Sequence, residues 1–195
     1  MPSHFFALLS RMKYIPRWAL MRNAAPENLS EHSLETAILA HALTVLHNTR
    51  CGGKLSPERA ATLALFHDAP EVLTGDLPTP VKYHSEQLRA AYQQVEDSAC
   101  ARLLGMLPED LRGAYAPLLS HRGGGDALLL RYVKAADKLS ALIKCMEERK
   151  AGNLEFCCAE AAARRALEEM RLPAVEYFLA EFLPAYEQPL DQLTN

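Results

Sequence analysis

Hydrophobic residues recur at helical spacing along nearly the whole chain. In the segment that begins near Asn28, apolar residues return every three or four positions, at Leu34, Ala37, Ile38, Ala42, Val45 and Leu46. This is the period of an amphipathic α-helix, in which such residues share one face. No stretch alternates apolar and polar residues for long enough to build a sheet. The pattern therefore predicts an all-α protein.

Capping residues and prolines divide this pattern into separate helices. Asn28 with Glu31 has the spacing of a capping box, and Ser56 followed by Pro57 marks another helix start, which we expect to continue through Asp68 to Pro70. Gly and Pro are too frequent at 73–80 for regular structure, so we predict a rigid loop there. Further helices are predicted at 5–15, ending before Pro16, at 85–104 and at 108–119. After a flexible break at 123–125, another helix is predicted from an N-cap at Asp126 to Glu148. Two more are predicted within 154–182, separated near Pro173.

The size and charge of the chain exclude several classes of protein. A chain of 195 residues suits one domain, and we expect a single domain over 1–195, with a core at about 28–150 and C-terminal helices at 154–190 packed on it. A net charge of −3 gives no general attraction to a nucleic-acid polymer or an anionic membrane. The five cysteines form no C-x-x-C pair, and no secretory signal or membrane-length apolar stretch is present. We therefore expect a cytoplasmic protein that binds neither a nucleic-acid polymer nor a membrane.

Histidine and carboxylate side chains interrupt the apolar faces of the predicted helices in three places. These are His32 in the first turn of its helix, His67-Asp68 after an apolar run, and Asp137 on the same stripe as Val133. Singly, each has an ordinary explanation, as an exposed histidine, a core histidine or an aspartate paired with a buried arginine. Together, two imidazoles and two carboxylates form a mixed nitrogen and oxygen ligand set for one divalent transition ion, and such a set accepts Co, Mn, Fe, Ni or Zn.

The same residues resemble the H…HD…D signature of the HD-domain metal-dependent phosphohydrolases. The surrounding strings resemble the bacterial 5′-deoxynucleotidase branch of that family, and the similarity runs from Ser3 past Glu148. These strings are SHFFALLSRMKYIPRWALMRN at 3–23, SEHS at 30–33, HDAPEVLTGDLPTPVK at 67–82 and KAADKLSALIKC at 134–145. The glycine run at 123–125 departs from the family pattern, but it lies in a connector and leaves the matched positions intact.

The resemblance implies an HD-domain helical bundle, usually a homodimer, that binds one divalent ion through His32, His67, Asp68 and Asp137. It also implies that Glu71 is the catalytic carboxylate. In a continuous helix Glu71 would share a face with His67 and Asp68, and Pro70 would be tolerated in the first turn of a new helix. The implied reaction is metal-assisted hydrolysis of a phosphomonoester, with Glu71 taking or giving the proton.

The substrate-binding residues are expected on two segments. A guanidinium forks onto two phosphate oxygens, so Arg17 is the candidate for the phosphate, and the neighbouring Trp18 is the candidate for the deoxyribose. The resemblance assigns substrate contact to the loop of Asp76, Leu77, Pro78 and Thr79, with Asp76 important for activity, and the ligands Asp68 and Asp137 are expected to contact substrate as well. The ordinary alternatives are a surface arginine, a core tryptophan and an aspartate that forms a turn.

The expected activity is removal of the 5′-phosphate from deoxyribonucleoside monophosphates. The alternatives are another HD-type chemistry, either a nucleoside triphosphohydrolase or a cyclic-nucleotide phosphodiesterase, and a nucleotide-binding regulator without catalysis. A triphosphohydrolase would need more cationic groups than Arg17, Lys82 and Lys134. Glu71 and Asp76 argue against a regulator, because a binding site needs no carboxylate that transfers protons. A purely structural helical scaffold would leave the four polar positions unexplained.

Overall fold

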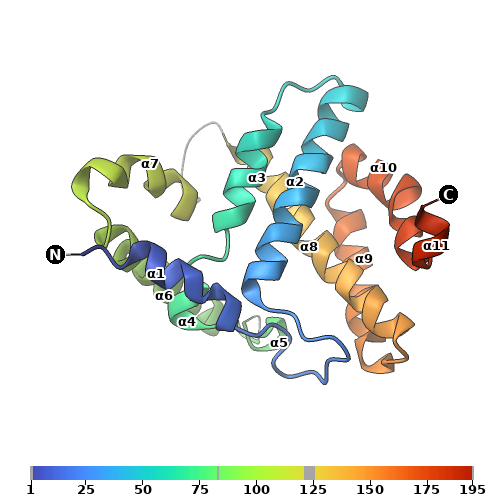
Figure 1. Cartoon of the computed structure of the whole chain (residues 1–195), viewed down its shortest axis with the longest axis horizontal. Helices are drawn as coiled ribbons and strands as arrows, with labels where there is room; N and C mark the ends of the chain where they lie inside the picture. Colours follow the sequence, from blue (N-terminus) through green and yellow to red (C-terminus); the bar gives the residue numbers. More distant parts are fainter. Residues whose placement is uncertain (1, 83, 121–125, 195) are drawn as a thin grey trace.

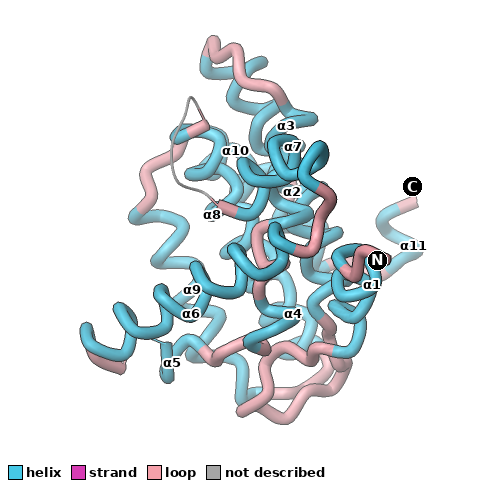
Figure 2. The backbone as a smooth tube through the Cα atoms, turned by 90° about the vertical axis from the view of Figure 1, so that its left-hand side faces the viewer, coloured by secondary structure: helices cyan, strands magenta, loops and turns pink. Residues whose placement is uncertain are grey.

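The structure, a computed structural model, describes residues 2–82, 84–120 and 126–194, and within these ranges it is helical without a β-strand (Figures 1 and 2). The prediction of an all-α protein is therefore confirmed. The α-helices are α1 (Phe5–Leu9), α2 (Leu29–Cys51), α3 (Pro57–Phe66), α4 (Glu71–Thr74), α5 (Thr79–Lys82), α6 (Glu86–Gly105), α7 (Glu109–Leu119), α8 (Ala127–Lys150), α9 (Cys157–Glu169), α10 (Pro173–Glu181) and α11 (Leu190–Leu193). Three 3₁₀ segments join them: η1 (Ser10–Tyr14), η2 (Leu154–Phe156) and η3 (Leu183–Glu187).

The start of α2 shows how local chemistry sets the helix boundaries. The Asn28 side chain accepts hydrogen bonds from the backbone N–H groups of Ser30 and Glu31, and the Glu31 carboxylate accepts one from the Asn28 N–H, which completes the predicted capping box. Gly52, in a left-handed conformation at φ 71°, ends the same helix. Ser56 caps α3 through the Arg59 N–H, with proline in the first turn as predicted.

Four sequence predictions about local structure need correction. The N-terminal helix changes from α to 3₁₀ at Ser10. Helix α3 ends at Phe66, so His67 and Asp68 lie in the turn that follows it. The segment 73–80 is only partly a loop, because α4 extends to Thr74 and α5 begins at Thr79.

The fourth correction concerns Asp126, which precedes α8 without capping it through its side chain. Its carboxylate instead pairs with Arg59 of α3 at 2.8 Å, so a tertiary ion pair replaces the local hydrogen bond. The break predicted at the glycines 123–125 lies outside the described residues.

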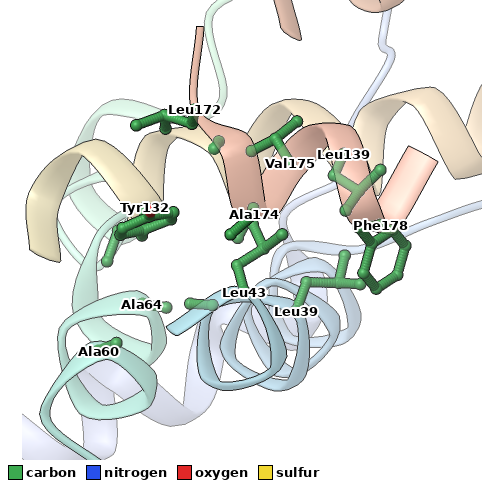
Figure 3. Packing of buried hydrophobic residues seen from close by; sticks show 14 of the residues in the cluster. Leu39, Leu43, Ala60, Ala64, Tyr132, Leu139, Leu172, Ala174, Val175 and Phe178 are labelled. Carbon is green, nitrogen blue, oxygen red and sulfur yellow. The ribbon is translucent and has the colours of Figure 1, made fainter. Parts of the chain in front are cut away.

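The main hydrophobic core lies where α2, α3, α8 and α10 meet. Figure 3 shows α10 laid across this junction, with Ala174, Val175 and Phe178 directed at Leu39 and Leu43 of α2 and at Leu139 of α8. A smaller cluster, Phe5, Ala69, Leu103, Leu107 and Leu119, joins α1, α6 and α7 to the turn after α3. The turn that carries His67 and Asp68 therefore lies between two packed cores. No helix in the described part of the chain is both long and apolar enough to cross a membrane.

A buried polar cluster at the C-terminal end of α8 holds the connection between η1 and α2, which crosses to this end of the molecule (Figure 1). Glu148, 1% exposed, accepts hydrogen bonds from the backbone N–H groups of Ala24 at 2.7 Å and Ala25 at 3.1 Å. It also accepts from Asn153 at 2.8 Å and pairs with Lys144. Burial alone would raise the pKa of Glu148, but Lys144 and these donors lower it to about 2. The cluster fixes the segment that precedes α2.

Glu148→Ala should destabilise the protein strongly. It would leave the Lys144 ammonium buried without its partner, and removing one member of a buried pair costs about 3–5 kcal/mol. The free energy of unfolding, measured by chemical denaturation, is the readout. The neighbouring Glu147, exposed on the same helix, supplies the matched control in Glu147→Ala. Equal stability of the two variants would contradict the role given to Glu148.

Candidate functional site

The four predicted metal ligands converge from three parts of the fold. His32 lies in the first turn of α2 with no exposed surface, His67 and Asp68 follow α3, and Asp137 lies midway along α8. The His32 Nε2 atom is 3.2 Å from Asp137 Oδ1 and 3.6 Å from Asp68 Oδ2, and His67 Nε2 is 3.1 Å from the same Asp68 oxygen. The structure thus brings together residues that are up to 105 positions apart in the sequence.

This donor set fits a divalent metal ion. One ligand atom from each of His32, His67 and Asp68 lies within 4.8 Å of the other two, and Asp137 adjoins His32. Among the described residues, the buried Nε2 atom of His67 has no partner with good hydrogen-bond geometry, and its nearest acidic oxygen is Asp68 Oδ2 at 3.1 Å. A buried polar atom without a partner is costly in a pure protein environment, whereas coordination would satisfy it. Imidazole nitrogens with carboxylate oxygens suit a divalent transition ion.

Hydrogen bonds behind the two imidazoles orient them toward the cluster. His67 Nδ1 donates a hydrogen bond to the Ala64 carbonyl oxygen at 2.6 Å, so Nε2 is the ring nitrogen that faces the cluster and that can bind a metal once it has lost its proton. His32 Nδ1 lies 3.1 Å from Ser140 Oγ, and Ser140 itself donates to Glu35 Oε2 at 2.5 Å. The Ser140 oxygen therefore accepts from His32, whose Nε2 then also keeps its lone pair for a metal.

Sequence reasoning missed Ser140 and Glu35. Their spacing held the signal, because each lies three residues after a predicted ligand, Asp137 and His32, and so shares its helix face.

The charges of the cluster stabilise one another. Burial would favour the neutral forms, but Asp68 and Asp137 raise the pKa of His67 to about 9. Burial alone would raise the pKa values of the two aspartates. However, His67 holds the pKa of Asp68 below its ordinary value, and His32 does the same for Asp137. The carboxylates are therefore ionised across the ordinary pH range, as metal ligands must be.

Glu71 lies beside the cluster at the first position of α4. Pro70 is the N-cap of this short helix, and a turn separates α4 from α3, so the two do not form one continuous helix. The Glu71 side chain is 7% exposed, and its Oε2 atom is buried with no hydrogen-bond partner in the part of the chain that the structure describes. Burial and the like charges of Asp68 and Asp76 raise the pKa of Glu71 to about 9. It lines a cavity of about 820 Å³ together with His67, Asp68 and Asp137.

Arg17 lies beside the cluster of predicted metal ligands. The alternative that it is a surface arginine is therefore wrong. Its side chain is 11% exposed, and its Nη1 atom is 3.5 Å from Asp68 Oδ2. Its Nε atom donates to Glu27 Oε2 at 3.3 Å. Burial would lower the pKa of Arg17, but Glu27 and the three aspartates around the site raise it, so the guanidinium is charged.

Trp18 has features of both expected roles, a residue beside the substrate and a core tryptophan. Its backbone is left-handed at φ 59°, which is uncommon for a residue other than glycine. Its indole N–H donates to Glu27 Oε2 at 2.8 Å, and its ring centroid lies 5.2 Å from that of Phe156. It therefore packs on the core while lying next to Arg17. Glu27, which joins both side chains, was not predicted from the sequence.

The predicted substrate loop is only partly drawn into the site. Burial raises the pKa of Asp76, and the positive charge of Arg17 opposes this shift. The charges of Asp68 and Asp137 also act on Asp76, so it lies near the cluster. Leu77 and Pro78 are half-buried and Thr79 is exposed at the start of α5, and no described contact joins these three to the metal ligands. Lys82 pairs with Glu96 of α6 at 2.7 Å.

Known proteins similar to this chain share both its sequence and its fold. The model of the YfbR-like 5′-deoxynucleotidase family matches residues 4–186. A 5′-deoxynucleotidase of Erwinia tasmaniensis is 50% identical over 193 residues, which cover 99% of this chain and 97% of that protein. The crystal structure of an HD-domain phosphohydrolase from Listeria innocua has a TM-score of 0.83 at 27% identity and covers 98% of this chain and 95% of its own.

A more distant fold relative is the HD phosphohydrolase of cyanophage S-2L, solved with dA and one catalytic Zn²⁺ ion. It has a TM-score of 0.66 at 15% identity and covers 94% of this chain and 96% of its own. The expected HD-domain helical bundle is thus confirmed. Since the family model spans most of the chain and a full-length relative shares half of its residues, the protein belongs to the YfbR-like 5′-deoxynucleotidase family.

Proposed function

We propose that this protein is a metal-dependent 5′-nucleotidase that hydrolyses deoxyribonucleoside 5′-monophosphates to deoxyribonucleosides and phosphate. The observation that carries the proposal is the convergence of two histidines, two aspartates and Arg17 on one site, in a chain half identical to a 5′-deoxynucleotidase. A phosphomonoester needs both a cationic site for its oxygens and a route for one proton.

In this proposal His32, His67, Asp68 and Asp137 hold one divalent transition ion, with Co, Mn, Fe, Ni and Zn all compatible with the donor set. The Zn²⁺ of the cyanophage relative supports an ion of this class. When bound, such an ion acts as a Lewis acid that stabilises negative charge on phosphoryl oxygens and makes water more acidic. Ser140 and the Ala64 carbonyl oxygen orient the two imidazoles toward it.

The remaining residues bind the substrate and move the proton. Arg17 binds the phosphate, since its Nη1 atom lies 3.5 Å from Asp68 at the edge of the ligand set and the surrounding carboxylates keep its guanidinium charged. Asp68 and Asp137 lie close enough to contact the phosphate too. Glu71, buried with one oxygen free of hydrogen bonds, takes the proton of the attacking water or gives one to the departing 5′ oxygen.

Trp18 faces the sugar in this proposal, and the loop of Asp76, Leu77, Pro78 and Thr79 contacts the nucleoside. Their positions just after Arg17 and just after α4 support these roles. A triphosphate would need further cations at the site. Lys82, one of the nearest, is paired with Glu96, which favours a monophosphate.

Three coarser features complete the proposal. We place residues 1–195 in one domain, supported by the core that α2, α3, α8, α9 and α10 share. We propose a homodimer, supported by the exposed apolar side chains of Leu34, Ile38 and Val45 along α2. We also propose a cytoplasmic location. Binding of a small nucleotide, without binding of nucleic-acid polymers or membranes, agrees with the net charge of −3.

His32→Ala and Asp137→Ala should each lose the metal and the activity together, because each removes a ligand from a different helix. Metal content by elemental analysis, beside turnover, is the measurement. His41→Ala, an exposed histidine on the same helix as His32, should keep both. A stoichiometric ion with normal turnover in Asp137→Ala would rule out its role as a ligand.

Glu71→Ala should keep the metal while kcat for deoxynucleoside monophosphates falls by a factor of about 10² to 10⁴, the usual contribution of a positioned acid or base. Phosphate release is measured across deoxy- and ribonucleotides with each metal added to chelator-stripped protein. The wild type should release orthophosphate from the deoxynucleoside monophosphates. Release of tripolyphosphate from triphosphates alone would refute the proposed function, and a Glu71 variant altered only in KM would refute the proton-transfer role.

Trp18→Ala should bring the ratio of kcat/KM for a deoxynucleotide over its ribonucleotide close to unity. An apolar wall that fails to bind a hydroxyl discriminates by about 10²-fold, and a direct clash adds to this. Trp18→Phe, which keeps a flat ring, should retain most of the preference. An unchanged ratio in folded Trp18→Ala would leave the residue with a packing role alone.

A further inference from the structure

Glu27 is the side chain through which the two residues of the substrate-binding pair, Arg17 and Trp18, are joined. Its Oε2 atom accepts hydrogen bonds from Trp18 Nε1 at 2.8 Å and from Arg17 Nε at 3.3 Å. Its other oxygen, Oε1, lies 3.7 Å from His32 Nδ1, on the side of the imidazole that faces away from the metal cluster. The Glu27 side chain is 12% exposed, so these contacts are shielded from water.

We propose that Glu27 is a positioning residue that sets how Arg17 meets the phosphate and how Trp18 meets the sugar. The inference rests on the proposed function, since it assigns those two roles to Arg17 and Trp18. In this proposal Glu27 contacts neither substrate nor metal and acts only through the side chains that it holds.

For Arg17, the contact with Glu27 decides which nitrogens are available. Glu27 occupies the Nε–H, and this leaves the terminal nitrogens to face the cluster, where Nη1 lies 3.5 Å from Asp68. Without Glu27, the carboxylates left around this guanidinium would be those of the proposed ligands Asp68 and Asp137 and that of Asp76. We expect Arg17 then to close onto these carboxylates and to bind phosphate less well.

For Trp18, the contact opposes an unfavourable backbone. A tryptophan at φ 59° persists only where its surroundings hold it, and here Glu27 binds the indole N–H while Phe156 packs against the ring. Loss of the Glu27 carboxylate removes the hydrogen bond to the indole N–H and leaves only the ring contact with Phe156. The ring would remain in apolar contact but lose its fixed orientation toward the sugar.

Backbone hydrogen bonds separate this role from a merely structural one. The Arg17 N–H donates to the Glu27 carbonyl oxygen at 3.0 Å, and the Leu29 N–H donates to the Ile15 carbonyl oxygen at 3.0 Å. Pro16 and Asn28 form the bridge between these two bonds. These bonds involve no side chain of Glu27, so a substitution there should leave the path of the chain intact and change only the orientation of the side chains.

The test uses Glu27→Ala and Glu27→Gln, with Glu168→Gln on the exposed face of α9 as the control. Trp18 is the sole tryptophan, so its fluorescence reports on the site directly. Titration of a deoxynucleoside monophosphate, with Glu71→Ala added to prevent turnover, gives Kd. Metal content, the melting temperature, and kcat/KM for a deoxynucleotide and its ribonucleotide complete the measurements.

Glu27→Ala should keep the metal, shift the Trp18 emission, raise Kd and KM by about tenfold or more, as expected for a lost charge-assisted hydrogen bond, and lower the preference for deoxyribose. Glu27→Gln can still accept from the Trp18 indole but carries no charge. It should therefore recover the sugar preference while Kd stays high.

Wild-type Kd and sugar preference in Glu27→Ala would overturn the proposal, and so would loss of metal in parallel with activity, which would make Glu27 a support of His32. If Glu27→Ala fails to fold, Glu27→Gln decides through the same readouts. A wild-type protein that hydrolyses no deoxynucleotide would instead refute the proposed function, whatever the Glu27 variants show.

Discussion

His32 has no surface exposed to water and lies within 3.6 Å of two carboxylates, those of Asp68 and Asp137. The rest of the site depends on this arrangement. A buried imidazole beside ionised aspartates is unstable unless every nitrogen has a defined partner. The fold supplies one partner from behind, through Ser140, and leaves the other nitrogen facing the cluster. The same division recurs at His67, where the Ala64 carbonyl oxygen is the rear partner. The Nδ1 atoms of both histidines are thus hydrogen-bonded to protein, and their Nε2 atoms face the cluster, where they suit a cation.

Helix packing determines where this cluster forms. His32, Asp137 and the turn after α3 come together because α2, α3 and α8 share one hydrophobic core, across which α10 is packed (Figure 3). A second, smaller core holds the same turn from the side of α1, α6 and α7. Glu71 follows directly from this turn, so the proposed acid or base is positioned by the same packing that positions the proposed metal ligands.

The segment before α2 carries Arg17 and Trp18, the proposed substrate-binding residues. It has little regular structure of its own, and polar contacts hold it at both ends. Glu148 and Lys144 bind its backbone near Ala24 and Ala25, while the bridge between Pro16 and Asn28 closes its other end. Arg17 and Trp18 therefore lie on a loop fixed from two directions, and this suits the substrate-binding role proposed for them, which requires one fixed orientation.

The sequence by itself determined what depends on short-range chemistry: the helical class, the capping box at Asn28, the proline start of α3, and the polar residues that interrupt apolar stripes. It also identified the ligand candidates, because a carboxylate on an apolar helix face is unusual wherever the helix packs. Only the tertiary structure decided that Asp126 pairs with Arg59, that Ser140 and Glu35 support His32, and that Glu27 joins Arg17 to Trp18. These partners are set by how helices and loops pack, and hydrogen bonds between distant residues leave no periodic signal in the chain. A local rule can state that a buried charge needs a partner, but the packing of separate elements selects which residue provides it.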